Sequence, residues 1–476
     1  MAVISIQQTT LNISNMNITD KYNQFLAYKE IDYKQHQYDG LEWCASRETG
    51  KAPLHGVRGG FIADEMGLGK TIMTIGLIVV NFLEYRRTLV VLPSILVEQW
   101  AQEIYRTTGH VALIYHGSAK RKITKERLNR APIVLTTYGI LVGSKRSKKE
   151  NLLHAVEWDR VIFDEAHHLR NKNSRFLSAK NLKARSRWLI SGTPVQNKIK
   201  DFYNMCNMLG LPASFYTQAD NREVILREFI LRRTKQQVGI QMPAIESITK
   251  NVAWQNEEEK KFAKDIHQAV AYPKTKLKMM NYARQTCILP AMMTSKVSSL
   301  INDSLIYPEH FMTTATNYSS KIDALIAGLV ERRGNGNGKI IFCHYRQEID
   351  EIKRRLMMSG FDKIVIFDSR LGLAKRMKLL NETVIEVLII QIKTGSEGLN
   401  LQKNFSEIYF VSPNWNPAIQ DQAIARCHRI GQTKDVQVFH YMMDSFDDEN
   451  RLITMDKYID LVQEDKRDMI QEVISQ

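Results

Sequence analysis

Short runs of β-branched and aliphatic residues alternate with longer amphipathic stretches in the first part of the chain. The runs GGFIAD, TLVVLP, PIVLTT, RVIFDE and RWLISG lie between residues 59 and 192 and have the composition of buried strands. The stretches between them have helical spacing, as in SILVEQWAQEI at 94–104. This alternation of strand and helix predicts a parallel sheet covered on both faces.

The same alternation returns after residue 338 with the runs KIIFCH, KIVIFD, EVLIIQ and EIYFVS. The sequence between the two blocks is charged and rich in methionine, and the last part repeats apolar residues at helical spacing. The pattern predicts an α/β protein with two similar lobes. Its expected parts are a polar N-terminal extension (1–29) that is loosely ordered over residues 1–25, lobe one (30–250), a helical connector (251–315), lobe two (316–445) and a C-terminal helix packed on the body (446–476).

Composition adds an expectation about partners. Of the 476 residues, 66 are Lys or Arg and 51 are Asp or Glu, a formal net charge of +15. This excess favours a polyanionic partner such as nucleic acid, although a basic solvated surface explains the charge equally well. The five cysteines are scattered singly and the histidines lack ligand spacing, so we expect an intracellular protein without disulfides or zinc. The most apolar run, at 71–83, is too short to span a bilayer, so we expect no membrane partner.

A glycine-rich stretch, ADEMGLGKT at 63–71, follows the first predicted strand and precedes an apolar helix. Its end matches the phosphate-binding pattern G-x-x-x-x-G-K-[ST], but Asp64 stands where that pattern has its first glycine. In such a loop Lys70 would reach the β- and γ-phosphates of ATP, and the Thr71 hydroxyl would ligate Mg²⁺. Taken alone, the stretch is equally a phosphate cradle with a variant start or a glycine-rich turn that carries a lysine.

Two carboxylates follow another predicted strand in RVIFDEAHHL at 160–169. Ligands of open α/β sheets bind at the carboxyl ends of the strands. Asp164 suits Mg²⁺ coordination there, and Glu165 suits a base that orients the attacking water. The alternative is a solvated acidic strand end, but the glycine loop in the expected order favours nucleotide hydrolysis.

Two arginines stand three residues apart in QDQAIARCHRIGQ at 420–432. We expect Arg426 and Arg429 to share one helical face, where they could stabilise charge that develops on a phosphate. Alone, this stretch would be a basic surface helix.

An ordered series of motifs runs through the chain: YKQHQYDGLEW (33–43), DEMGLGKT (64–71), TLVVLPSILVEQW (88–100), IVLTTYGIL (133–141), DEAHHLRN (164–171), WLISGTPVQN (188–197), ILRRTKQQV (230–238), ARQTCILP (283–290), QIKTGSEGLNL (391–401) and WNPAIQDQAIARCHRIGQTKDV (415–436). From about residue 30 to 460 the series resembles the Swi/Snf family of helicase-like ATPases in helicase superfamily two. The resemblance implies two RecA-like lobes, the cofactors ATP and Mg²⁺, and double-stranded DNA as partner. The resemblance also favours a phosphate cradle over a simple glycine-rich turn at 63–71, because the family usually has aspartate at the position of Asp64.

The resemblance implies a role for each matching position. The ATP-binding positions are Gln37, which reads adenine, and Asp64, Gly67, Leu68, Gly69, Lys70 and Thr71. The catalytic positions are Lys70, Asp164, Glu165, Gln422, Arg426 and Arg429, with Thr71 and Asp164 holding the metal and the two arginines acting as fingers across the interlobe cleft. Hydrolysis would be coupled to lobe motion through Ser191, Gly192 and Thr193. The DNA-contacting positions are Pro93, Thr137, Lys393, Thr394 and Trp415, with Asn416 near the DNA path.

Two positions depart from the family pattern, since Ser369 and Ser396 stand where glycine is common, and neither change removes a catalytic group. Because the connector is short, we expect no bromodomain-, chromodomain- or RING-like additions. A bare motor of this size resembles the global-transactivator proteins of insect-infecting large DNA viruses. SKRSKK at 144–149 is a nuclear-import signal, a DNA-contacting loop or, more often for such runs, a solvated loop.

The resulting expectation is a nuclear (for a viral protein, host-nuclear) DNA-stimulated ATPase. It would move along double-stranded DNA and displace or remodel bound proteins in chromatin or transcription. A DEAD-box RNA helicase is disfavoured because the chain has LPSILVEQW and SGTPVQN in place of P-T-R-E-L and S-A-T motifs. A DNA-binding transcriptional scaffold with a vestigial ATPase is disfavoured by the intact set of Lys70, Asp164, Glu165, Arg426 and Arg429.

Overall fold

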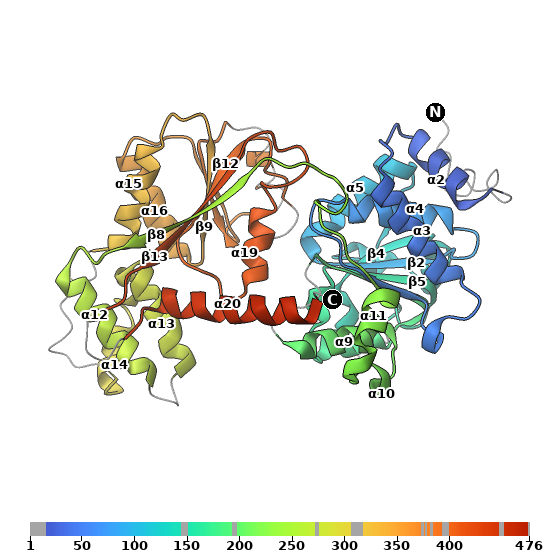
Figure 1. The fold of residues 1–476 in the computed structure, drawn as a ribbon, viewed down its shortest axis with the longest axis horizontal. Coiled ribbons are helices and arrows are strands. Elements are labelled where there is room, and N and C mark those ends of the chain that lie inside the picture. The colour runs from blue at the N-terminus through green and yellow to red at the C-terminus, as the bar shows by residue number, and fades with distance from the viewer. Residues whose placement is uncertain are drawn as a thin grey trace. The chain divides into compact units, whose positions relative to one another are not determined.

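The computed structural model describes residues 16–143, 151–192, 198–271, 276–305, 318–372, 376, 378–380, 384–392, 399–446 and 452–474. The chain divides into two compact units (Figure 1). The first is Met1–Gln241 with Met469–Gln476, and the second is Met242–Asp468. Each unit contains one parallel sheet with its own hydrophobic core.

The first unit is built on a seven-stranded sheet in the order β3-β4-β2-β5-β6-β1-β7. Its strands are β1 (Gly59–Ile62), β2 (Thr88–Leu92), β3 (Leu113–Ile114), β4 (Ile133–Thr137), β5 (Glu157–Asp164), β6 (Lys183–Ile190) and β7 (Ile230–Leu231). Neighbouring strands pair in parallel. The predicted runs form β1, β2, β4, β5 and β6, which confirms them; the two edge strands, β3 and β7, have two residues each and carry no recognisable pattern.

Helices cover both faces of this sheet. They are α2 (Ile18–Ala27), α3 (Gln35–Thr49), α4 (Lys70–Val80), α5 (Val97–Thr108), α6 (Lys125–Arg130), α7 (Tyr138–Val142), α8 (Ser174–Lys180), α9 (Ile199–Leu209), α10 (Ala213–Tyr216) and α11 (Arg222–Phe229), with short 3₁₀ turns η1 (Leu54–Gly56), η2 (Ser94–Leu96), η3 (Ala119–Lys122), η4 (Ala166–Leu169) and η5 (Ala219–Asn221). Alternate residues of β2 enter different cores: Leu89 and Val91 pack with α8, α9 and α11, and Val90 packs with α2 to α5. A sheet buried on both faces explains why β1, β2 and β4 are buried at every residue.

The N-terminal extension differs from the expectation of a loosely ordered segment up to residue 25. Asn17 accepts a hydrogen bond from the Asp20 N–H (2.8 Å) and caps α2. Tyr22 and Phe25 of this helix are buried in the core of the first unit. Apolar residues at helical spacing therefore outweigh the polar composition of the segment.

The second unit contains a six-stranded sheet in the order β10-β11-β9-β12-β13-β8. Its strands are β8 (Ile245–Val252), β9 (Gly338–Cys343), β10 (Ile364–Phe367), β11 (Val387–Gln391), β12 (Phe405–Phe410) and β13 (Val436–Met443). The four predicted runs form β9 to β12. The strands β8 and β13 were not predicted, and they pair in parallel along their whole length. The division between the units therefore falls after Gln241, not at residue 250 as expected.

The predicted helical connector, 251–315, is part of the second unit. The helices of this unit include α12 (Glu257–Gln268), α13 (Lys276–Ile288), α14 (Val297–Asn302), α15 (Ser320–Glu331), α16 (Arg346–Met358), α19 (Pro417–Ile424) and most of α20 (Met455–Ile474), with the 3₁₀ turns η6 (Ala269–Ala271) and η7 (Pro290–Met293). Residues of α12 to α16 share one core, and α20 confirms the predicted C-terminal helix. Among the described residues, no helix combines the length and apolar character needed to cross a bilayer.

Candidate nucleotide-binding site

The glycine loop connects β1 to α4 in the first unit. Gly67 and Gly69 have positive φ angles of 94° and 80°, which favour glycine. A Cβ at Gly69 would lie 2.1 Å from Gln37 Nε2, so the loop also needs glycine for space. Thr71 follows Lys70 in the first turn of α4. A loop of this shape that opens a helix presents backbone N–H groups to an anion.

Lys70 and Gln37 both contact this loop. Lys70 Nζ donates to the carbonyl oxygens of Asp64 (2.6 Å) and Glu65 (3.2 Å). Gln37 Nε2 donates to the carbonyl oxygen of Leu68 at 3.2 Å. The helix α3 therefore places the predicted adenine-reading residue directly against the predicted phosphate loop.

Asp64 has a different environment from the rest of the loop. Its side chain is buried and accepts hydrogen bonds from Arg233 N (3.0 Å), Nε (3.1 Å) and Nη2 (2.6 Å). Because Arg233 donates all three hydrogen bonds, the Asp64 carboxylate fixes the start of the glycine loop against that arginine. The sequence did not indicate this role for Arg233, although the residue lies in the ILRRTKQQV motif. A direct contact between Asp64 and the nucleotide stays a prediction.

Asp164 lies at the carboxyl end of β5, as predicted. Trp100 Nε1 donates to its Oδ2 (2.7 Å), the Glu165 N–H donates to its Oδ1 (3.0 Å), and Tyr138 Oη donates to its carbonyl oxygen (2.6 Å). Burial and, as the second cause, the charge of Glu165 raise the pKa of Asp164 to about 7. The sequence did not predict Trp100 and Tyr138 as site residues, although they lie in the motifs TLVVLPSILVEQW and IVLTTYGIL.

The side-chain oxygens of Thr71 and Asp164 are of the kind that binds a divalent cation. A buried carboxylate with a raised pKa gains from a nearby positive charge, and hydroxyl and carboxylate oxygens are ligands that Mg²⁺ prefers. Thr71 and Asp164 therefore fit the metal role that the sequence suggested. Glu165 has the positive φ of 49°, and its Oε2 lies 3.2 Å from His167 Nδ1.

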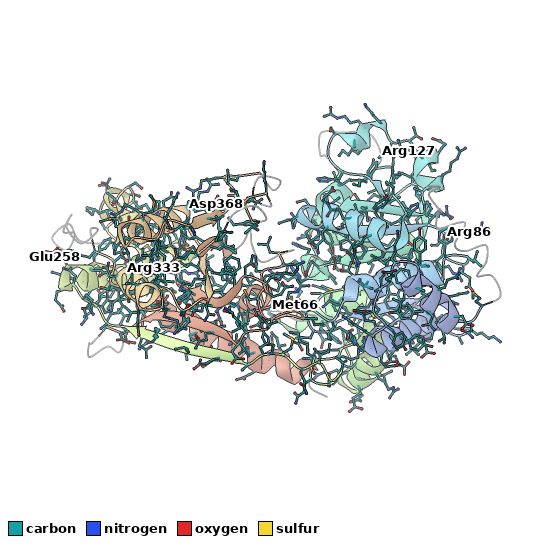
Figure 2. The ribbon with its side chains drawn as sticks, turned by 90° about the horizontal axis from the view of Figure 1, so that it is seen from above. Met66, Arg86, Arg127, Glu258, Arg333 and Asp368 are labelled. Carbon is teal, nitrogen blue, oxygen red and sulfur yellow. The ribbon has the colours of Figure 1, made fainter. Side chains whose placement is uncertain are left out.

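The end of β6 reaches the same loop. A Cβ at Gly192 would lie 2.9 Å from Met66 Cγ and 3.7 Å from Lys70 Nζ, so Ser191 and Gly192 run beside the loop. Met66 is labelled in Figure 2. The first unit thus brings Gln37, Lys70 and Gly192 together; Thr193, the third predicted coupling residue, lies outside the described residues.

The predicted arginines of the second unit are not on a helix. The helix α19 ends at Ile424, and Arg426 and Arg429 lie in the turns that follow it, which corrects the expectation of a shared helical face. The Leu401 N–H donates to the Arg426 carbonyl oxygen at 3.0 Å. Arg429 Nη1 donates to Asn400 Oδ1, and burial lowers the pKa of Arg429. Gln422 is buried on α19.

The predicted DNA-contacting residues have mixed placements. Pro93 and Thr137 are buried just after β2 and at the end of the neighbouring strand β4. Trp415 is half-buried, with its ring centroid 6.1 Å from that of Tyr458 in an edge-to-face arrangement, and Asn416 caps α19. Their contacts with DNA stay predictions. Lys393, Thr394, Ser396 and SKRSKK (144–149) lie outside the described residues.

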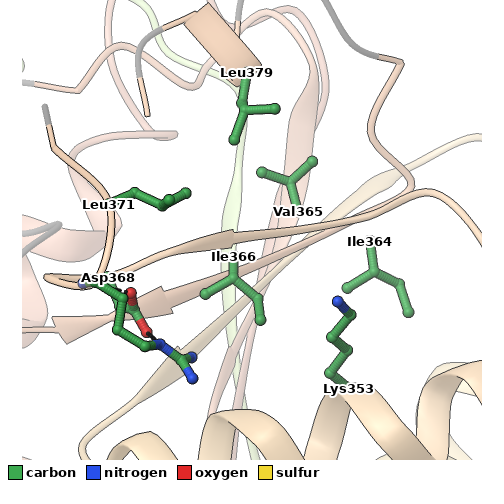
Figure 3. A pocket seen from close by; sticks show the side chains of 8 residues that line it. Lys353, Ile364, Val365, Ile366, Asp368, Leu371 and Leu379 are labelled. Carbon is green, nitrogen blue, oxygen red and sulfur yellow. Dashed lines mark hydrogen bonds and ion pairs between the residues drawn. The ribbon is translucent and has the colours of Figure 1, made fainter. Parts of the chain in front are cut away.

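A pocket of about 320 Å³ lies at the edge strand β10 of the second unit (Figure 3). It is lined by Lys353 of α16, by the aliphatic side chains of β10, and by the Asp368–Arg370 ion pair, whose Arg370 Nε and Asp368 Oδ2 are 2.6 Å apart. Ser369, one of the two departures from the family pattern, stands between these two residues and accepts a hydrogen bond from Arg346 Nη2 at 2.9 Å. None of the predicted site residues lines this pocket.

Comparisons with known proteins agree with this arrangement. The SNF2-related domain family matches residues 36–300, and the helicase conserved C-terminal domain family matches residues 320–431. The chain is 27% identical over 469 residues to the ATP-dependent DNA helicase DDM1 of Arabidopsis thaliana, covering 85% of this chain and 58% of the relative. It is 26% identical over 445 residues to a probable global transactivator of Orgyia pseudotsugata multicapsid polyhedrosis virus, covering 86% of each.

The chain thus spans little more than half of the plant relative and most of the viral one. Among solved structures, the helicase domain of Hef from Pyrococcus furiosus matches with a TM-score of 0.55 at 17% identity, over 88% of this chain and 97% of that chain. This likeness confirms the predicted fold class, two parallel-sheet α/β domains of the RecA-like helicase type. The chain belongs to the SNF2 family of helicase-like ATPases.

Proposed function

We propose that the protein is a DNA-stimulated ATPase that moves along double-stranded DNA and displaces or remodels proteins bound to it. The observation that carries the proposal is the cluster of Gln37, Lys70 and Gly192 around one glycine loop, with Asp164 at the neighbouring strand end. Four sequence motifs far apart in the chain contribute to this cluster, and three more supply its supports Trp100, Tyr138 and Arg233. Such a cluster binds and hydrolyses a nucleoside triphosphate.

The residues of the first unit have distinct tasks in this reaction. Lys70 would exchange the carbonyl oxygens of Asp64 and Glu65 for phosphate oxygens, because an ammonium group binds an anion more strongly than a neutral acceptor. Glu165 would orient the attacking water, with His167 beside it. A bound Mg²⁺, held by Thr71 and Asp164, would neutralise charge on the phosphates.

Other roles rest on the family resemblance. Arg426 and Arg429 would stabilise charge in the transition state, with Gln422 one turn earlier. Ser191, Gly192 and Thr193 would couple hydrolysis to motion, and Pro93, Thr137, Lys393, Thr394 and Trp415 would contact the DNA backbone. Backbone contacts suit a motor that passes over any sequence.

The net charge of +15 supports a polyanionic partner. One relative carries the name of a DNA helicase and another that of a transactivator, which supports DNA as the track and the nucleus, or a host nucleus, as the place of action. We propose chromatin or transcription proteins on DNA as the targets.

Steady-state ATP hydrolysis with no nucleic acid, duplex DNA, single-stranded DNA or RNA tests this function. We expect duplex DNA to stimulate the rate and added salt to reduce the stimulation, because salt weakens phosphate contacts. Lys70→Ala should lower the rate about 100-fold or more, the loss typical for a donor that stabilises developing charge. Lys51→Ala, at an exposed lysine, is the matched control and should hydrolyse ATP like the wild type.

A second pair of variants tests the loop itself. Gly69→Ala places a Cβ against Gln37, whereas Gly56→Ala introduces one at a similar positive φ of 71° with no atom within 4 Å. Fluorescent-nucleotide titration should show loss of binding in the first variant only. Stimulation by RNA alone would instead identify an RNA helicase. DNA binding without any hydrolysis by the folded wild type would leave a scaffold.

A further inference from the structure

The acidic start of the nucleotide loop lies alongside the segment that leaves the first unit. The strand β7 pairs with the end of β1, and the pairing continues beyond both strands. The Ala63 N–H donates to the Leu231 carbonyl oxygen (2.7 Å), and the Glu65 N–H donates to the Arg233 carbonyl oxygen (2.9 Å). The first half of the loop is therefore an extension of the sheet.

Arg233 joins this loop start to the helix that carries Gln37. Its Nε and Nη2 form a two-pronged pair with the Asp64 carboxylate, at 3.1 Å and 2.6 Å. Its Nη1 donates to the carbonyl oxygen of His36. A Cβ at Gly40 would lie 2.6 Å from Arg233 Nη2, so α3 packs tightly against the guanidinium. Only the planar fork of arginine makes these contacts together.

Lys235 holds the next loop residue. Its Nζ lies 2.8 Å from Glu65 Oε1, and its N–H donates to Glu65 Oε2 at 2.8 Å. The lysine side chain is 7% exposed and that of Glu65 is 41% exposed, so water screens this pair in part. Beyond a turn in which the Ile240 N–H donates to the Lys235 carbonyl oxygen (2.9 Å), the chain enters the second unit at Met242.

The same two loop residues also hold the catalytic lysine. Lys70 Nζ donates to the carbonyl oxygens of Asp64 and Glu65, whose carboxylates are bound by Arg233 and Lys235. A nucleotide that draws Lys70 away changes the hydrogen bonding of both residues. Their side chains connect that change to the segment that leads to the second unit.

We propose that Asp64–Arg233 and Glu65–Lys235 form a latch that holds the ATP-binding loop in shape and couples its state to the segment leaving the first unit. Arg233 and Lys235 are positioning residues in this proposal, which rests on the proposed function. The latch also gives a physical role to the two acidic residues that begin this variant of the phosphate loop. Arg233 chiefly sets nucleotide affinity, and the Glu65–Lys235 pair chiefly sets the coupling.

The first test measures nucleotide binding without hydrolysis, by fluorescent-ATP titration. Arg233→Lys keeps the charge but loses the two-pronged pair, and should weaken binding about tenfold, as expected for loss of a charge-assisted hydrogen bond of about 1.4 kcal/mol. Asp64→Asn should weaken binding in the same direction and replaces Arg233→Lys if that variant does not fold. Arg227→Lys, at an arginine whose side chain is 70% exposed, should bind like the wild type. Wild-type affinity in both Arg233→Lys and Asp64→Asn would overturn this half of the proposal.

The second test measures the amount of triplex-forming strand displaced from duplex DNA per ATP hydrolysed. In Lys235→Met and Glu65→Gln we expect this ratio to fall at least about threefold, and the double variant to be no worse than either single one, as for residues that act as a pair. Lys200→Met, at an exposed lysine, should keep the wild-type ratio. An unchanged ratio, or losses that multiply in the double variant, would overturn the coupling. If the wild type binds nucleotide but displaces no strand, the proposed function fails while the binding test of the latch still stands.

Discussion

A buried carboxylate, Glu48, connects three elements that end at the nucleotide site. Arg160 donates from Nε to Glu48 Oε1 (2.6 Å) and from Nη2 to Oε2 (2.5 Å). Trp188 Nε1 and Asn81 Nδ2 complete the shell at 2.8 Å and 2.9 Å. Glu48 belongs to α3, Arg160 to β5 and Trp188 to β6, so the pair fixes the helix of Gln37 against the strands that lead to the acidic and coupling motifs.

Arg160→Met removes the positive partner and keeps most of the side-chain volume. Both side chains of the pair are 0% exposed, so the remaining carboxylate cannot recover its hydration. Loss of one partner from a buried ion pair costs about 3–5 kcal/mol. We expect about 3 kcal/mol for the first unit, the lower end of that range, because Trp188 and Asn81 still donate to Glu48.

Urea unfolding followed by tryptophan fluorescence measures this loss. Four of the six tryptophans, Trp43, Trp100, Trp158 and Trp188, lie in the first unit and report on it. With a slope of about 3 kcal/mol per molar urea, the midpoint of Arg160→Met should fall by about 1 M. Glu48→Gln should lose a similar amount, because it leaves the guanidinium unpaired. The double variant should be at least about 2 kcal/mol more stable than the sum of the two losses predicts.

The exposed pair Glu103–Arg106 on α5 provides the control, since Arg106→Met should cost less than about 1 kcal/mol. A loss below about 1 kcal/mol in Arg160→Met, or strictly additive losses in the double variant, would show that this pair does not organise the unit.

Two further predictions concern buried carboxyl groups. Trp100→Phe removes the N–H donor to Asp164. We expect the Mg²⁺ concentration for half-maximal ATP hydrolysis to rise about tenfold, because losing a group that orients a metal ligand weakens metal binding. An unchanged Mg²⁺ dependence would refute the role of Trp100. Burial raises the pKa of Glu348 to about 7, above its unfolded value of about 4.3, so the folded protein alone holds this proton between those values. Stability from this group is therefore present below pH ~4.3 and lost as pH rises to ~7, by about 4 kcal/mol. Glu348→Gln lacks this titration and should gain stability relative to the wild type from pH 5 to 8 in thermal unfolding scans, whereas parallel curves would contradict the assignment.

Local patterns in the sequence determined much of this protein. The apolar runs identified nine strands, because a sheet buried on both faces requires them, and the motifs located Lys70, Asp164 and Glu165 at strand or loop ends. Those assignments depend on neighbours a few residues away, which a sequence displays directly. The sequence did not predict the polar strand β8, because its place in the sheet comes from pairing with β13, far along the chain.

Tertiary structure decided the contacts that shape the site. Arg233 and Asp64 are 169 residues apart in the chain, and Trp100 and Asp164 are 64 apart, so no periodicity connects them. The helix α19 ended before the two arginines, which removed the shared face that their spacing suggested. Spacing along the chain reports the backbone that a segment prefers, whereas the partner of a buried charge depends on which strands the folded sheet places side by side.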